Sequence, residues 1–257
     1  MAKFEIKDGV AIIPEGTTKI GEFAFMNCHS LERVTIPTSV TEIECHAFHQ
    51  CTSLKSVIIP KSVEEIGHSA FTGCTSLESI TIPASVTKIE TSVFNNCASL
   101  KSIAIPELVE LIEYSAFSGC TSLKSIIIPK SVEEIGHSAF FSCNSLESIE
   151  ISNGVKKIGT TAFYHCTSLK SITIPGSVTE IAGTAFSDCA SLECVTVLSR
   201  TKFREEEHPW LGKGLFIGCT LLKTINVPSD CVDYYKEMLP EELHDKIVEL
   251  NEFQGLF

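Results

Sequence analysis

Residues 51–74, CTSLKSVIIPKSVEEIGHSAFTGC, contain the pattern that decides the fold of this chain. The first part of this stretch returns at residues 120–140, where the only difference is Ile126 in place of Val57. The two copies lie 69 residues apart, which is three lengths of a 23-residue unit. Self-similarity at a fixed period is the sequence signature of a repeat architecture.

The 23-residue unit continues along most of the chain as columns of identical residue types. Its cysteine column consists of Cys28, Cys51, Cys74, Cys97, Cys120, Cys143, Cys166, Cys189 and, after a longer interval, Cys219. A phenylalanine precedes each of these cysteines by three residues and a leucine follows by three, as Phe71 and Leu77 flank Cys74. The unit is L-x-x-[V/I]-x-[V/I]-P-x-x-V-x-x-I-x-x-x-A-F-x-x-C. So many columns would not stay in register over nine units by chance.

The leucine end of the unit predicts a short β-strand. Ile80 and Ile82 alternate with polar residues and are β-branched, as is typical of strands. Pro83 then ends the strand, because proline has no N–H to donate to a neighbouring strand. Most units have a proline in this column; Ser152 and Leu198 are the exceptions.

The rest of the unit predicts a return leg and one tight turn. Val63 and Ile66 open the return leg. Ala70, Phe71 and Cys74 follow at a spacing that suits a single helical or 3₁₀ turn. Each unit would then direct about eight side chains inward, and no unit can bury them alone. Stacked units form one continuous core, in which the phenylalanines are expected to form an aromatic column.

These expectations give an α/β solenoid, rich in β-structure, with about nine repeats between two caps. We expect an N-terminal cap and partial repeat over 1–25, because alternating apolar residues surround Asp8-Gly9, a turn sequence. The repeats would occupy 26–228, with an insertion near 198–214. The cap over 229–257 is expected to hold a helix at Ser229–Leu239, with Ser229 or Asp230 as N-cap, and a strand from Ile247.

The columns resemble the BspA-like leucine-rich repeats, which share the A-F-x-x-C ending and the L-x-x-I-x-I-P strand. The resemblance covers about residues 10–228. The tail is also similar to the C-terminal cap of that family, with Val227-Pro228, Tyr235-Lys236 and Lys246-Ile247-Val248. The resemblance implies a right-handed superhelix and a role in adhesion or protein recognition, often at microbial surfaces. It implies no catalytic residues.

Charge and hydropathy narrow the classes of partner. The net charge of −12 repels phosphate backbones, so we expect no nucleic acid partner. No apolar run is long enough for a membrane span, so we expect no membrane insertion. The N-terminus has no signal-peptide pattern. A full-length chain would therefore be cytoplasmic, whereas a trimmed one would be secreted or at the cell surface, as the resemblance implies.

The cysteine column is best explained as a buried ladder of small side chains, because free cysteine is among the most buried residue types. No C-x-x-C pair indicates zinc. Disulfides between neighbouring units are geometrically possible, but the column offers no unique pairing. Cys45, Cys194 and Cys231 lie off the column. Cys194 occupies an outward strand position and is the best candidate for a reactive thiol.

The outward positions of the strands form a small, weakly polar surface that includes three apolar residues. Ile58, Ala104 and Ile127 share one column and are candidates for partner binding. Ordinary sheet surface is the alternative. The same surface has too few regular threonines for ice binding, and the chain has too few aspartates for a calcium site.

The insertion between Cys189 and Cys219 supplies the remaining candidates. Arg200, Arg204 and Trp210, the single tryptophan, are of the types enriched in binding hot spots. Insertions in repeat proteins often lie on the binding face. The alternative is an irregular unit with Trp210 packed under the cap.

No motif for catalysis, metal binding or cofactor binding occurs in the sequence, so we expect a non-enzymatic module. The leading hypothesis is a monomer that recognises a protein partner. The alternative is a structural component that self-associates, which sedimentation over a concentration series would distinguish. A glycan-binding module ranks lower, because such modules usually expose aromatic residues on the binding face and the strand face has none.

Overall fold

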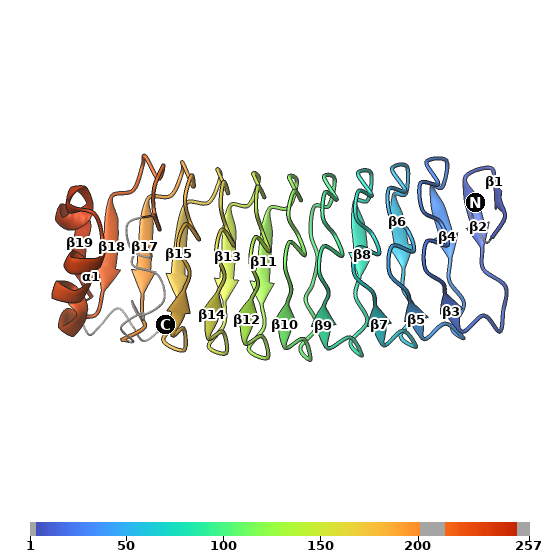
Figure 1. Cartoon of the computed structure of the whole chain (residues 1–257), viewed down its shortest axis with the longest axis horizontal. Helices are drawn as coiled ribbons and strands as arrows, with labels where there is room; N and C mark the ends of the chain where they lie inside the picture. The colour runs from blue at the N-terminus through green and yellow to red at the C-terminus, as the bar shows by residue number, and fades with distance from the viewer. Residues whose placement is uncertain (1–3, 201–213, 251–257) are drawn as a thin grey trace.

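The computed structural model describes residues 4–200 and 214–250. They form a solenoid of about ten turns, stacked along one axis from the N-terminal hairpin to the C-terminal helices (Figure 1). Each turn has three sides, which are a strand, a second and shorter strand, and a series of tight turns.

The first side is a parallel sheet, here called the first sheet, built from the L-x-x-I-x-I segments. Its strands are β2 (Val10–Ile12), β4 (Arg33–Thr35), β6 (Ser56–Ile58), β8 (Ser79–Thr81), β11 (Ser125–Ile128), β13 (Ser148–Ile151), β15 (Ser171–Ile174), β17 (Cys194–Val197), β18 (Thr224–Val227) and β19 (Ile247–Glu249). Neighbouring strands pair in register with the repeat, as in Ser56↔Ser79. The strands end before the proline column, as the sequence predicts.

The first sheet is interrupted between β13 and β15, and again where Ser102 makes only an isolated bridge to Ser79. In the segment that follows each strand, a serine hydroxyl usually bonds to the preceding turn, and this hydrogen bond is lost at the repeat of Ser102. Ser62 and Ser85 each donate a hydrogen bond to a carbonyl of the preceding turn, at 2.6 Å. Leu108 takes this position in the interrupted repeat and has no hydroxyl to donate.

The return leg forms a second parallel sheet, which the sequence did not predict. Its two-residue strands are β3 (Lys19–Ile20), β5 (Glu42–Ile43), β7 (Glu65–Ile66), β9 (Lys88–Ile89), β10 (Leu111–Ile112), β12 (Glu134–Ile135), β14 (Lys157–Ile158) and β16 (Glu180–Ile181). The isoleucine of each strand points into the core and its neighbour points to solvent. Lysine and glutamate of adjacent turns pair along this sheet, as in Lys157–Glu180 at 3.5 Å.

The third side, here called the turn face, is not helical. The hydrogen bonds from Ala70 N to Gly67 O and from Cys74 N to Phe71 O each close a tight turn, at 3.2 Å. Within these turns, at the third position of each, Ser69 and Gly73 have φ angles of 55° and 74°. A left-handed residue stops helix propagation, so the expected helical turn is replaced by consecutive single turns. Backbone hydrogen bonds such as Phe71 N to Val93 O, at 2.9 Å, join them to the next repeat.

The core is continuous along the axis. In a typical repeat eight side chains are buried, namely Val63, Ile66, Ala70, Phe71, Cys74, Leu77, Ile80 and Ile82. The phenylalanines form the expected aromatic column. The ring centroids of Phe48 and Phe71 lie 5.1 Å apart with an interplanar angle of 4°, and the series extends to Phe216 with spacings up to 6.1 Å.

A hairpin covers the N-terminal end of the core. β1 (Ile6–Lys7) pairs antiparallel with β2 through a turn at Asp8 and Gly9, both of which have positive φ angles, as a type I′ hairpin requires. The ring of Phe4 lies 5.4 Å from that of Phe25 and so covers the first phenylalanine of the column.

Short helices and a last strand follow the repeats at the other end. They are the 3₁₀ helix η1 (Ser229–Cys231), α1 (Val232–Met238), the 3₁₀ helix η2 (Glu241–Lys246) and β19, which adds to β18 in parallel. The expected single helix is therefore split, and the predicted N-cap was wrong. Pro228 and Cys231 are the N-cap residues of η1 and α1, and neither makes a side-chain capping hydrogen bond.

Candidate functional site

The outward column of the first sheet places the three apolar candidates in the predicted order. The exposed fractions of Ile58 and Ile127 are 81% and 61%, and Ala104 is also exposed. The register pairs Ile58 with Thr81, and Ala104 and Ile127 follow in the next two repeats. Three strand spacings therefore separate Ile58 from Ile127, or about 14 Å. Side chains at this separation form two contact points rather than one patch.

A groove of about 720 Å³ lies beside Ile58. Its apolar lining comes from Val34, Ile36, Ile58 and Pro60, on β4, β6 and the segments that follow them. Val34 and Ile36 are core residues, so the groove reaches the edge of the core. The volume falls within the range of ligand pockets in proteins.

The groove is flanked by positive charge on an otherwise acidic molecule. Arg33 and Lys61 both line it and both are exposed. Among the described residues, neither side chain forms an ion pair within 4.0 Å. The opening therefore combines an apolar centre with two cations that remain available to an acidic partner.

The candidates of the insertion are only partly described. Arg200 is exposed and its guanidinium lies 3.6 Å from the carboxylate of Asp230 in the C-terminal cap. Arg204 and Trp210 lie outside the described residues. Arg200 follows β17, which lies six repeats along the solenoid from the strand of Ile58, so the structure does not bring these candidates together (Figure 1).

The cysteine column is a hydrogen-bonded ladder inside the core. The thiol of Cys74 donates to the carbonyl oxygen of Phe48 at 3.2 Å, and Cys97 repeats this contact with Phe71. Burial raises the pKa of the Cys120 thiol to about 12. All twelve cysteines are free thiols in the structure, and Cys28, Cys45 and Cys194 are the three that are partly exposed.

These burial differences predict which thiols react. At pH 7.5 and in native protein, Cys194 should be modified first by iodoacetamide, and the buried thiols should remain protected. Cys28 and Cys45 should react more slowly, because burial raises the pKa of both and lowers the fraction of thiolate. Mass spectrometry of peptides after timed labelling measures the order. Rapid labelling of Cys97 in native protein would contradict the buried ladder.

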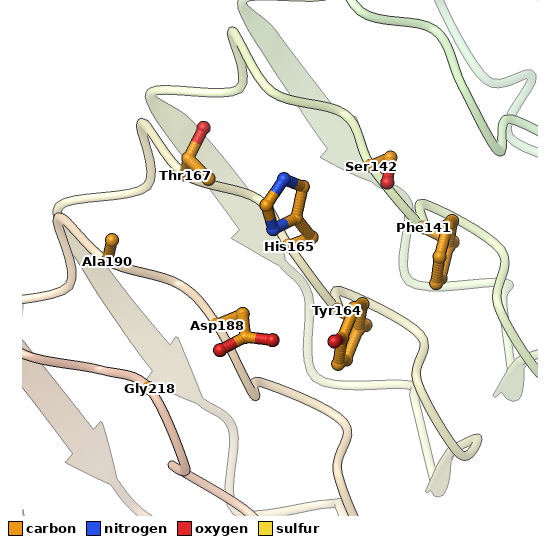
Figure 2. Close-up of a pocket in the computed structure, with 8 residues that line it drawn as sticks. All are labelled: Phe141, Ser142, Tyr164, His165, Thr167, Asp188, Ala190 and Gly218. Carbon is orange, nitrogen blue, oxygen red and sulfur yellow. The ribbon is translucent and has the colours of Figure 1, made fainter.

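A second concave site lies on the turn face, where sequence reasoning did not look. Phe141 and Tyr164 are the first variable residues of two successive A-F-x-x-C endings, and their rings stack at 5.2 Å and 8°. A shallow pocket of about 460 Å³ extends from them past His165 to Asp188 (Figure 2). Adjacent aromatic residues in one variable column were the available sequence signal.

The carboxylate of Asp188 lies beside Tyr164 in this pocket (Figure 2). The hydrogen bond between the two side chains, together with the negative charge of Asp188, raises the pKa of the Tyr164 hydroxyl. Asp188 also leans over the next repeat, since a methyl group added to Gly218 would lie 1.9 Å from its Oδ1 atom. A side chain at 218 would have to displace this carboxylate, whereas the φ of 76° is the left-handed conformation that His165 and Asp188 also adopt in this column.

The described ranges 4–200 and 214–250 contain no group of three or more histidine, cysteine, aspartate or glutamate side chains that could hold a metal ion. In the same ranges, no helix has both the length and the apolar character needed to cross a membrane.

The parallel strands, the stacked core and the repeating A-F-x-x-C turns define a leucine-rich-repeat solenoid. The chain belongs to the family of BspA type leucine rich repeat regions, whose model matches residues 10–124, 89–208 and 145–244 in six copies. This confirms the resemblance of the columns to that family. No curated protein matches the chain at a significant level.

Several solved structures are similar to this chain. A leucine-rich repeat protein of T. pallidum is 26% identical, with 92% of each chain covered and a TM-score of 0.51. A leucine-rich repeat protein from Bacteroides ovatus is 24% identical over 94% of this chain and 92% of that one, with a TM-score of 0.43. A leucine rich cell surface protein from Faecalibacterium prausnitzii is 24% identical, with 91% of each chain covered and a TM-score of 0.40.

Proposed function

We propose that this chain is a non-catalytic recognition module that binds a protein partner along the outer face of the first sheet. The observation that supports it best is the exposed Ile58 beside a groove whose lining is apolar. Covering a side chain whose exposed fraction is 81% contributes favourable binding free energy, because burial removes its apolar surface from water.

The charges around the groove favour a partner segment that is acidic and carries an apolar anchor. Arg33 and Lys61 are placed to meet carboxylates at the rim, whereas Ile58 and Pro60 would contact the anchor. The rest of the molecule is acidic, with a net charge of −12, so an acidic segment would be directed toward this end. Screening of exposed charges by salt should then weaken binding.

The second contact point is Ile127. An extended partner segment of five residues spans the distance of about 14 Å from Ile58, at about 3.3 Å per residue. A partner lying across the strands could thus use both isoleucines, with Ala104 leaving room between them. Small residues such as Ser79 and Ser125 keep this path flat. The family typically forms surface and adhesion proteins, and the proposal gives this chain the same kind of role.

Ile58→Glu should weaken partner binding at least about tenfold without unfolding the chain, because it places a charge in an apolar contact. Ile127→Glu should weaken the same partner less. Immobilised wild type and variants are incubated with extract of the source organism, and each captured protein is quantified by mass spectrometry. Circular dichroism verifies that each variant is folded.

Leu221→Glu is the matched control, because Leu221 is an exposed leucine with an exposed fraction of 52% that lies off the first sheet. The proposal is supported by a protein that wild type and Leu221→Glu retain equally and that Ile58→Glu loses. Equal retention by all three chains would place the binding surface elsewhere. Absence of any specifically retained protein would remove the proposed function.

A further inference from the structure

We infer that the turn-face pocket formed by Phe141, Tyr164, His165 and Asp188 binds a neutral sugar in its pyranose form. This site is separate from the first sheet and goes beyond the proposed recognition of a protein. It combines an aromatic ring, a carboxylate and an imidazole in one shallow cavity of about 460 Å³. Figure 2 shows Tyr164 between Phe141 on one side and Asp188 on the other.

The ring of Tyr164 has one face covered and one face without an aromatic neighbour in its column. Phe141 stacks on the first face, with centroids 5.2 Å apart. On the opposite side the same column continues with Ser187, a small and buried residue that supplies no ring. The stack of partly exposed aromatic rings therefore ends at Tyr164, toward the pocket.

A pyranose matches a platform of this kind. One face of the sugar ring presents C–H groups, which carry slight positive charge, and an aromatic ring carries negative charge on its face. The edge of a sugar carries hydroxyl groups, which need partners when the ring stacks. An aromatic platform with polar side chains around it satisfies both demands.

Those polar partners surround Tyr164. The carboxylate of Asp188 lines the pocket beside Tyr164 and has about four lone-pair positions. These positions can accept two neighbouring sugar hydroxyls. The His165 ring, 6.2 Å from that of Tyr164, lines the same pocket and adds a nitrogen that can donate or accept. Thr167 also lines it, and its hydroxyl, which donates to Asn144 O at 3.3 Å, can still accept.

The backbone fixes these side chains in place. His165 and Asp188 occupy left-handed positions in successive repeats, with φ angles of 60° and 57°. The amides of His165 and Asp188 donate to the carbonyls of Ser187 and Ile217 in the next repeat, at 2.9 and 2.6 Å. The pocket is therefore built on hydrogen-bonded repeats, which limits the ordering cost on binding.

A cation is the other ligand that an aromatic ring and a carboxylate suggest, since cations bind over aromatic faces. A cage for a quaternary ammonium normally encloses it between several ring faces. Here Phe141 and Tyr164 stack on each other. Their facing surfaces are therefore covered, and a single ring face remains rather than a cage. The pocket thus favours a flat, neutral ring bearing hydroxyls.

The test uses saturation-transfer difference NMR of the full chain with methyl glycosides of glucose, galactose, mannose and N-acetylglucosamine. At least one glycoside should receive saturation mainly on the C–H groups of one ring face. Tyr164→Ala should raise the dissociation constant of that glycoside at least tenfold. Tyr164→Phe should still give saturation mainly on the C–H groups of one ring face. Asp188→Asn should weaken binding by a smaller factor, because a carboxylate accepts stronger hydrogen bonds than an amide.

Tyr114→Ala is the matched control, because Tyr114 is also an exposed turn-face tyrosine, stacked on His137 at 5.5 Å. It should leave glycoside binding unchanged, as should Ile58→Glu, which separates this inference from the proposed function. Choline chloride serves as the cationic probe. The inference would be overturned if choline received saturation and no glycoside did, or if no probe received saturation. It would also be overturned if Tyr114→Ala and Tyr164→Ala weakened glycoside binding equally.

Discussion

Phe117→Ala is expected to lower the free energy of unfolding by about 3 to 5 kcal/mol, the usual cost of removing a fully buried phenylalanine. The Phe117 side chain is fully buried, and its ring lies 5.5 Å from that of Phe94 and 5.2 Å from that of Phe140. The cavity would open in the middle of the column, where backbone hydrogen bonds to both neighbouring repeats resist collapse.

The position of Phe117 should also change how the chain unfolds. Each repeat contacts only its neighbours, so the stability of a solenoid is approximately a sum over repeats and their interfaces. A weak central repeat divides the array, and urea denaturation followed by circular dichroism should show a broader or two-step transition. Phe141→Ala, at a partly exposed position, is the control and should cost less than half as much. Equal losses for the two variants would contradict the aromatic column as the main stabilising feature.

The sequence was sufficient to predict the core, because each inward column is apolar and the phenylalanine, cysteine and leucine columns each contain one residue type. The period of 23 places Phe71 and Phe94 at equivalent positions of successive repeats, so that stacking of the repeats also stacks the two rings. Exposure of Ile58 and Ile127 followed from strand alternation alone. These predictions needed no knowledge of loop geometry.

The turn face could not be predicted in the same way, because its conformation depends on φ angles rather than on hydrophobic pattern. Ser69, Ser142 and His165 all take left-handed conformations, which few sequence rules assign to serine or histidine. Contacts between repeats impose them, as in the hydrogen bond from Ser69 N to Thr91 O at 2.9 Å. The Tyr164 pocket was missed for this reason.

The groove beside Ile58 was beyond prediction for a different reason. Part of its wall comes from residues after the strands, including Thr38 and Lys61, and the path of that turn determines whether a hollow exists. Exposure of one isoleucine is a property of the strand, whereas a groove is a property of two successive turns. The sequence therefore located the residue but not the shape around it.

Gly154 shows how a departure from the repeat changes the backbone. Most repeats have serine in its column, and in Ser177 the hydroxyl donates to Val155 O of the preceding turn at 2.8 Å. In the repeat of Gly154, Ser152 replaces the proline, and the amide of Gly154 donates to Ser152 O at 2.8 Å. This tighter turn draws Gly154 against the preceding repeat. A Cβ atom added to it would lie 1.8 Å from the carbonyl oxygen of Lys130.

Gly154→Ser should therefore destabilise the chain by about 2 to 3 kcal/mol, the cost of forcing extra atoms into a packed site. Restoring the common residue of a repeat usually stabilises a protein, so the two arguments predict opposite signs for the change in the free energy of unfolding. Urea denaturation of wild type and variant measures this change. Gly176→Ala is the control, because its added Cβ would meet nothing closer than Leu198 O at 3.6 Å, and it should be neutral or slightly stabilising. A stabilised Gly154→Ser chain would show that this turn adopts the geometry of its neighbours.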